Sequence, residues 1–260
     1  MMWILETAAV AFGLYSALPV PRFDWNQKNM RYALAAFPLV GAGLGLAYWA
    51  WAVLCARLAL PTLLRGAGLC VLPALFTGGI HLDGYCDVSD ALASHAASEK
   101  KREILRDPSC GAFAVIRLCV YYVASFALCC ALEPTAQALV CLGLGFVFSR
   151  CLSGLSLTVL PIAEGSSLAR AFADAADRQR VSAVLVLLAG LGLAGLLYAG
   201  GWRLFSAALA ATLLVSLRCR RTALREFGGV SGDLAGWFLV KEEFWLLAVL
   251  VIAQLRGWLT

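Results

Sequence analysis

The stretch LCVLPALFTGGIHLDGYCDVSDAL, residues 69–92, decides how this chain folds, because an apolar run meets three carboxylates within it. Asp83, Asp87 and Asp90 follow the run CVLPALF after only a few residues. Charged groups are costly to hold in hydrocarbon. The junction therefore predicts a membrane edge, where an apolar segment leaves the lipid and a polar face meets water.

The composition of the whole chain is that of a membrane protein. Of its 260 residues, 62% are hydrophobic and only 14% are charged, against roughly 25% in a typical soluble domain. Such a chain cannot cover a water-facing surface with polar groups, so we expect an all-α fold, a polytopic integral membrane helical bundle. The connections are too short for a second domain, which predicts a single membrane-embedded domain over residues 1–260.

Apolar runs long enough to cross a bilayer recur along the chain. A helix needs ~20 such residues, and the runs predict about seven spans, with a range of six to eight. The segment 3–20 either adds a span or lies in the interface. The candidate spans are residues 33–55, 63–80, 112–132, 136–160, 181–201, 203–217 and 244–259.

Basic residues orient this predicted bundle. The tight turns and their flanks hold Arg57, Arg65 and Arg203, whereas four longer polar connections hold most of the remaining Lys and Arg. Seven spans place these four on one side, which the positive-inside rule assigns to the cytoplasm. The net charge of +5 has the same explanation, so we expect no nucleic-acid partner. The four connections are residues 21–32, 81–111, 161–180 and 218–243.

The ten cysteines and the glycine-rich runs indicate packing. No CxxC pair is present, and most cysteines lie in apolar runs, as Cys129 and Cys130 do. Buried cysteine behaves as a small hydrophobe, so we expect neither a disulfide framework nor a zinc site. Glycine-rich runs such as residues 39–50 predict close approach between membrane helices.

The three aspartates form the first candidate site. On a helix, Asp83, Asp87 and Asp90 would lie within an arc of about 60°. Like charges at this spacing repel, and a divalent cation would reverse that effect. Mg²⁺ takes one or two carboxylates and completes its shell with water and substrate phosphates. The pattern predicts a magnesium–phosphate site, where Gly84 permits close approach of a ligand; the alternative is a solvated helix face.

A second polar patch is EKKREILRDPSCGAF, residues 99–113. Its charges recur at spacings of three and four, as on a salt-bridged interfacial helix, and we favour that interpretation for Glu99 and Lys100. Further along, a cation and an anion stand just before Pro108, where they would bind phosphate and support the metal. The candidates here are Arg102, Arg106, Asp107 and Gly111.

A third patch is REFGGVSGDLAGWFLVKEE, residues 225–243. Glycines with a serine and an aspartate before an apolar run suit a loop whose backbone N–H groups approach phosphate. The sequence contains no GxxxxGK[ST] motif, so this is not a Walker A loop. A turn without a ligand is the alternative. The substrate-binding candidates are Arg225, Gly229, Ser231, Gly232, Asp233 and Glu242.

Two further residues are functional candidates. His81 adjoins the aspartates but projects about 200° from Asp83 around a helix, so a role as general base and a hydrogen-bonding role both remain open. Arg150 closes the apolar run GLGFVFSR, and a cation inside a membrane segment is a functional candidate by default.

At this point the motifs support a family resemblance. The run GIHLDGYCDVSDAL followed by REILRDPSCGAFAVI resembles the HLDGLADTxDG and EIMRDSxxGxxG patterns of the cobalamin synthase, or adenosylcobinamide-GDP ribazoletransferase, family. Two further blocks agree in order, namely SALPVP with FPLVGAGLGL, and FGGVSGDLAG with Glu242. Ala91, Pro108, Ser231 and the pair Tyr85-Cys86 depart from the family's pattern, but no aspartate is lost.

The resemblance implies the last assembly step of the cobalamin nucleotide loop. Adenosylcobinamide-GDP and α-ribazole, or its 5′-phosphate, are joined with release of GMP. The resemblance also implies a Mg²⁺-dependent, multi-pass enzyme of the cytoplasmic (inner) membrane, with its active site facing the cytoplasm. It suggests an association with other enzymes of nucleotide-loop assembly. The residues carried over by position are Asp83, Asp87, Asp90, Arg106, Asp107, Asp233 and Glu242.

The roles of these residues follow as a hypothesis. Asp83 and Asp87 hold Mg²⁺, with Asp90 shared between two ions if two are bound. Arg106 binds phosphate oxygens, because phosphoryl transfer needs charge neutralisation and in-line positioning. Either Asp90 or His81 takes the proton of the attacking hydroxyl.

Two other protein classes fit less well. A CDP-alcohol phosphotransferase also carries a DG-containing aspartate motif at a membrane edge, but the Ala-Arg of its pattern is absent here. An ion-coupled transporter would hold carboxylates near the bilayer midplane, in broken helices related by internal repeats. In this chain the acids gather at one predicted face, and the sequence shows no repeat.

Overall fold

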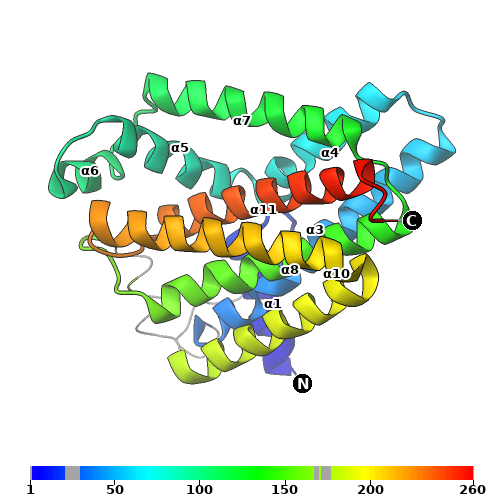
Figure 1. Cartoon of the computed structure of the whole chain (residues 1–260). Helices are drawn as coiled ribbons and strands as arrows, with labels where there is room; N and C mark the ends of the chain where they lie inside the picture. Colours follow the sequence, from blue (N-terminus) through cyan, green and yellow to red (C-terminus); the bar gives the residue numbers. More distant parts are fainter. Residues whose placement is uncertain (1, 21–29, 167–169, 171–176, 260) are drawn as a thin grey trace.

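The computed structural model describes residues 2–20, 30–166, 170 and 177–259 (Figure 1). Within these ranges every regular element is a helix, and one isolated parallel bridge joins Ile162 to Val230. The all-α prediction is therefore confirmed. The helices are α1 (Met2–Tyr15), α3 (Ala33–Arg57), α4 (Thr62–Thr77), α5 (Ile80–Ala93), α6 (Ser98–Ile104), α7 (Ala112–Ala131), α8 (Ala136–Val159), α10 (Arg178–Glu226) and α11 (Gly232–Leu255).

Several helices are suited to a membrane. Among the described residues, α3, α7, α8 and α10 are each long and apolar enough to cross it, and α4 with α5 would make a fifth, broken span bent by 93°. This supports the polytopic class, but the predicted count of seven is not confirmed. The predicted spans 181–201 and 203–217 both lie in α10, whose path breaks at Gly201 (φ 72°, ψ 171°). Figure 1 shows its two arms doubling back there.

Two of the predicted polar connections are largely helical, which the spacing of the aspartates and of the charges after Glu99 predicted for the first but not for the second. Residues 81–111 contain most of α5 and all of α6, and the loop between α10 and α11 shrinks from 218–243 to 227–231. Helix α5 exposes Asp83 and buries its other face, including Val88 and Ala91. The predicted connection 21–32 lies mostly outside the described residues.

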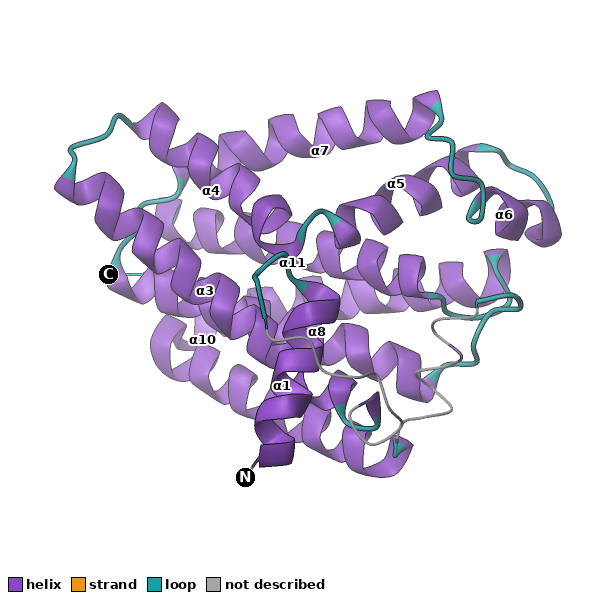
Figure 2. Cartoon of the chain, turned by 180° about the vertical axis from the view of Figure 1, so that it is seen from behind, coloured by secondary structure: helices purple, strands orange, loops and turns teal. Residues whose placement is uncertain are grey.

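The connections gather at opposite ends of the bundle, as Figures 1 and 2 show. At one end, Lys101 of α6 pairs with Glu226 at the end of α10. At the other, the side-chain amide of Gln254 donates to the carbonyl of Glu133 at 2.7 Å. The described connections around α6 and at the end of α10 thus lie apart from the tight turn at Glu133. The face at the α6 end is called the polar end below.

Glycines bring the central helices close together. A Cβ on Gly41 of α3 would lie 2.4 Å from the carbonyl oxygen of Phe146 on α8, and one on Gly45 would lie 2.9 Å from Gly143. No real Cβ tolerates such distances, so these positions require glycine. Small residues let membrane helices pack at short range, and the packing role predicted for residues 39–50 is confirmed.

Candidate active site

Helix α5 owes its direction to two glycines. Gly78 and Gly79 adopt left-handed φ angles of 64° and 81°, a conformation that favours glycine. They allow the chain to turn by 93° between α4 and α5. The turn carries the three aspartates of α5 away from the axis of α4 and toward the polar end.

Helix α5 is then held against α11 at very short range. A Cβ on Gly84 would lie 2.7 Å from the carbonyl oxygen of Asp233, and one on Gly236 would lie 3.3 Å from the backbone of His81. Gly84 therefore serves helix packing, which differs from the predicted role of admitting a ligand. The close contact brings the first turn of α11 beside the aspartates of α5.

The structure brings four carboxylates together at this junction. Asp83 is exposed and Asp87 is half-buried. Asp83, Asp90 and Asp233 all lie near enough to Asp87 to repel its charge. Ser231 caps α11 by accepting a hydrogen bond from Leu234 N at 3.2 Å, which fixes the turn that carries Asp233. We call Asp83, Asp87 and Asp233 the acidic face.

Asp90 differs from the other three because both of its oxygens are engaged. Oδ2 accepts the backbone N–H of Gly111 at 2.5 Å, and Oδ1 accepts that of Ala114 at 2.8 Å. Asp90 thereby caps the N-terminus of α7, where free N–H groups and the helix dipole favour a carboxylate. A Cβ on Gly111 would lie 2.4 Å from Asp90 Oδ2. Gly111 thus makes room for the cap.

The acidic face suits a hard cation but does not form a complete protein cage. Among the described residues, no group of three or more His, Cys, Asp and Glu side chains is arranged to hold a metal ion. Mg²⁺ needs only one or two carboxylates when water and substrate phosphates supply the remaining oxygens. Asp83 and Asp87 have no cationic partner within 4 Å in the described ranges. Their donor set therefore fits this cation.

The two arginines of the second patch hold the polar end together. Arg102 donates to the carbonyl of Phe227 at 3.3 Å and lies 3.5 Å from the Glu164 carboxylate. Arg106 donates to the carbonyl of Glu164 at 3.1 Å, and its guanidinium lies over Gly165. Both arginines thus contact the loops next to α6. No described hydrogen bond or ion pair joins them to the acidic face.

Asp107 and Arg225 also lie at this end, but apart from the carboxylates. The backbone N–H of Ser109 donates to Asp107 at 2.9 Å. The hydroxyl and backbone of Ser109 hold the pKa of Asp107 below its usual value, so this exposed carboxylate is ionised at neutral pH. Arg225 is exposed, and its carbonyl accepts a hydrogen bond from Ser98 at 3.5 Å.

The glycines of the third patch have different surroundings. A Cβ on Gly229 would lie 2.6 Å from both Pro161 O and Ala163 N, so this residue is glycine because two loops cross there. Around Gly232 the space is open. Only Gly232 is therefore placed where the start of α11 could admit a ligand.

Glu242 lies far from the acidic face. It is fully buried and pairs with Thr212 of α10. Nine residues separate it from Asp233, which is about 14 Å along a helix and half a turn around it. The predicted role of Glu242 in substrate binding has no support in this placement, and helical spacing alone could have indicated the opposite face.

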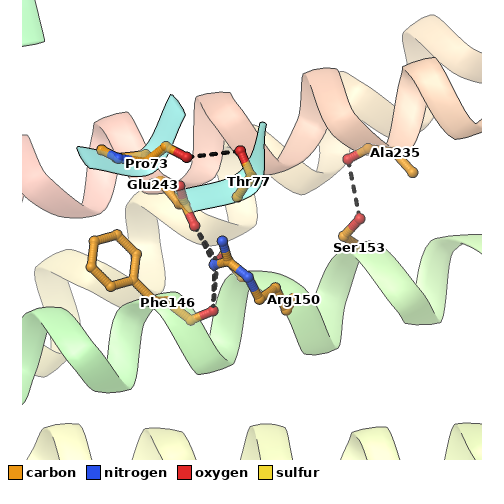
Figure 3. A network of polar contacts seen from close by, with 8 residues as sticks. Pro73, Thr77, Phe146, Arg150, Ser153, Ala235 and Glu243 are labelled. Carbon is orange, nitrogen blue, oxygen red and sulfur yellow. Dashed lines mark hydrogen bonds and ion pairs between the residues drawn. The ribbon is translucent and has the colours of Figure 1, made fainter. Parts of the chain in front are cut away.

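The sequence interpretation passed over the neighbouring acid, Glu243, which is the partner of Arg150 (Figure 3). Arg150 is fully buried and also donates to the carbonyl of Phe146 at 2.9 Å. Its guanidinium lies 5.8 Å from the ring centre of Phe37. The pair therefore ties α8 to α11 in the bundle interior and contacts α3.

His81 belongs to this interior cluster. Its ring lies 5.7 Å from Phe37, and it lines a small cavity with Thr77, Arg150 and Glu243. His81 is buried, and its Nε2 atom has no hydrogen-bond partner among the described residues. It faces away from the acidic face, as its spacing from Asp83 predicted.

Comparisons with known proteins cover nearly the whole chain. The profile of the family described as Cobalamin-5-phosphate synthase matches residues 7–251. A protein of Lachnoclostridium phytofermentans named adenosylcobinamide-GDP ribazoletransferase is 37% identical, over 98% of this chain and 96% of its own length.

More distant relatives carry the same name. One from Clostridium perfringens strain SM101 is 27% identical over 90% of this chain and 93% of its own length. One from Geobacillus sp. strain WCH70 is 29% identical over 89% of each chain. No solved structure matches the chain significantly.

Proposed function

Since the chain belongs to the Cobalamin-5-phosphate synthase family, we propose that it is the transferase of the final joining step. The donor is adenosylcobinamide-GDP, and the acceptor is α-ribazole or its 5′-phosphate. The products are adenosylcobalamin, or its 5′-phosphate, and GMP. The relatives' printed name supports both substrates.

The reaction is a phosphoryl transfer in which one bond to phosphorus replaces another. The acceptor hydroxyl attacks the phosphorus that carries cobinamide, the bond from that phosphorus to GMP breaks, and the hydroxyl proton is lost. Negative charge grows on the leaving phosphate, so the reaction needs charge neutralisation and in-line positioning. A bound Mg²⁺ would supply that neutralisation.

The observation that carries the proposal is the acidic face at the start of α11. Asp83 and Asp87 would hold the cation, with Asp233 beside them. The engagement of Asp90 with α7 favours a positioning role for Asp90 over metal binding. Asp90 and His81 were the candidate bases, yet neither presents a free atom to this face.

The membrane setting is part of the proposal. The polar end carries the acidic face together with Lys101, Arg102, Arg106 and the basic end of α10. Excess basic residues mark the cytoplasmic side of a membrane protein. We therefore propose a multi-pass enzyme of the cytoplasmic membrane whose active site opens to the cytoplasm.

The test is GMP release by the purified full-length protein in detergent. Adenosylcobinamide-GDP and α-ribazole with Mg²⁺ should give GMP and the corrinoid product in equal amounts. Asp83→Asn should reduce turnover by about 100-fold or more, as loss of a group that stabilises transition-state charge does. Glu103→Gln, an exposed acid on α6, is the matched control and should keep wild-type turnover. No GMP from the wild-type protein would refute the function.

A further inference from the structure

Three cations from α7, α10 and α11 lie near one another. Lys241 of α11 is half-buried, and its ammonium lies 3.8 Å from the ring centre of Trp237. Arg218 of α10 and Arg117 of α7 are exposed, and both are near enough to repel the charge of Lys241. Helix α11 packs against both α10 and α7, which explains how the three side chains meet. We call these three residues the cationic trio.

The cationic trio has no counter-charge in the described part of the chain. Among the described residues, no carboxylate lies within 4 Å of Lys241, Arg117 or Arg218. The ring of Trp237 lies beneath the ammonium, and its buried Nε1 donor also lacks a partner there. A half-buried cation without a counter-charge, such as Lys241, is costly, and residues of this kind commonly mark a functional site. An anion bound among them would relieve the repulsion.

A row of aromatic rings runs beside the trio. Tyr85 of α5 lies 5.5 Å from Tyr121 of α7, and Tyr121 lies 6.0 Å from Phe244 of α11. All three side chains are only partly buried. Arg117 is close enough to Tyr85 to act on its charge. Partly exposed rings next to cations suit a ligand that carries both a flat base and a phosphate.

The position of the trio relative to Asp233 narrows the choice of ligand. Lys241 follows Asp233 by eight residues, which is about 12 Å along α11 and about 80° around it. A diphosphate held by a cation on the acidic face cannot also occupy the trio at that separation. The distance between Asp233 and Lys241 leaves room for a ribose, with the reacting phosphorus at the acidic face and a separate phosphate at the cationic trio.

We propose that Lys241, Arg117 and Arg218 bind the 5′-phosphate of a phosphorylated acceptor. The proposal rests on the proposed function, because it assigns the acceptor's position in that same reaction. The rings of Tyr85 and Tyr121 then face the acceptor's base. Lys and Arg donors to a phosphate form charge-assisted hydrogen bonds, which are stronger than neutral ones.

The experiment compares two acceptors, α-ribazole 5′-phosphate and α-ribazole, in the GMP-release assay. Lys241→Gln and Arg117→Gln should each lower kcat/KM for the phosphorylated acceptor by about 10- to 100-fold, mainly through KM, as loss of a bond to a charged group does. Both should leave kcat/KM for α-ribazole within about twofold of wild type. Lys241→Arg should restore kcat/KM for the phosphorylated acceptor. Because Arg117 is exposed, its variant tests the site even if Lys241→Gln fails to fold.

The control is Arg203→Gln at the opposite end of the bundle. Arg203 also lies over a tryptophan ring, 5.7 Å from the centre of Trp202, so its loss removes a similar cation–π contact. This variant should match wild type with both acceptors. An equal loss with both acceptors in the trio variants would overturn the proposal, because the trio would then not recognise the acceptor's phosphate.

The phosphate of a lipid headgroup is the competing ligand, and a second set of measurements distinguishes it from the acceptor's phosphate. The kinetics are repeated in nanodiscs of phosphatidylcholine alone and of phosphatidylcholine with phosphatidylglycerol. Variant effects that appear only with phosphatidylglycerol, and equally for both acceptors, would assign the trio to lipid and overturn the proposal. If the wild-type protein releases no GMP with either acceptor, the proposed function fails and this inference falls with it.

Discussion

The cap that Asp90 makes on α7 gives a sharp prediction about a residue of the aspartate motif. Asp90→Ala removes both acceptors from the N–H groups of Gly111 and Ala114. Loss of a helix N-cap costs about 0.5–2 kcal/mol. Ala114 is fully buried, so its unpaired N–H adds about 1–3 kcal/mol. We expect a total loss of about 1.5–5 kcal/mol of stability.

The assay combines thermal unfolding in detergent with a Mg²⁺ titration of GMP release. Asp90→Ala should lower the unfolding midpoint, whereas Asp90→Asn, which keeps one oxygen acceptor, should lose about half as much. In Asp90→Asn the Mg²⁺ concentration for half-maximal turnover should stay within about twofold of wild type, because Asp90 holds a helix and no metal. Gly111→Ala should destabilise the protein in the same way, since its Cβ would displace the carboxylate.

One pattern of results would refute this reasoning. If Asp90→Ala unfolded at the wild-type temperature while both Asp90 variants needed much more Mg²⁺, Asp90 would be a metal ligand. The hydrogen bonds to α7 would then be dispensable for stability. A positioning role predicts a lower unfolding midpoint with an unchanged Mg²⁺ requirement, whereas a ligand role predicts an unchanged midpoint with a higher Mg²⁺ requirement. The unfolding and Mg²⁺ measurements together therefore separate the two roles.

Three further predictions concern how α5, α8 and α11 are held. Gly84→Val should reduce turnover more than tenfold, because its side chain would push α5 off the first turn of α11, whereas Gly190→Ala, with open space around it, should match wild type in the same assay. Arg150→Ala should lower the unfolding midpoint strongly, by the equivalent of about 3–5 kcal/mol, since it leaves the largely buried Glu243 carboxylate without its cationic partner; an unchanged midpoint would contradict this. Glu242→Gln should leave the KM for both substrates near wild type, and a tenfold rise would return Glu242 to the binding site.

Much of the helical architecture could be predicted because it depends on local pattern. Long apolar runs predict spans, and basic residues predict which connections share a side. The polar segments were predicted less well. Residues 218–226 and 232–243 are helical because their buried faces pack against neighbouring helices, and a count of polar residues does not record that.

In the candidate site, too, local features could be predicted from the sequence and tertiary contacts could not. The helical spacing of Asp83, Asp87 and Asp90 is a local property, and all three do lie on one helix. The partners of Asp90 lie 21 and 24 residues further along the chain, so only the tertiary structure shows that its oxygens are occupied. The same is true of Arg150, whose partner Glu243 comes from another helix.

Glu242 is a different case, because its position relative to Asp233 on a helix could have been predicted from the sequence. A spacing of nine residues from Asp233 places it about half a turn away on a helix. This placement was not predicted because residues 218–243 were treated as a loop, in which helical phase has no meaning. Once α11 is known to begin at Gly232, the opposite placement of the two residues follows.

The central claim is that the acidic face binds a divalent cation together with the donor's diphosphate. The most direct measurement is Mn²⁺ binding to the purified protein in the presence of adenosylcobinamide-GDP, monitored by electron paramagnetic resonance. Mn²⁺ is suitable because it also favours carboxylate oxygens. Wild type and Asp90→Asn should bind Mn²⁺ with similar affinity, and Asp83→Asn and Asp87→Asn should each bind it at least tenfold more weakly. Mn²⁺ binding by the Asp83 and Asp87 variants that equals wild type would contradict the claim.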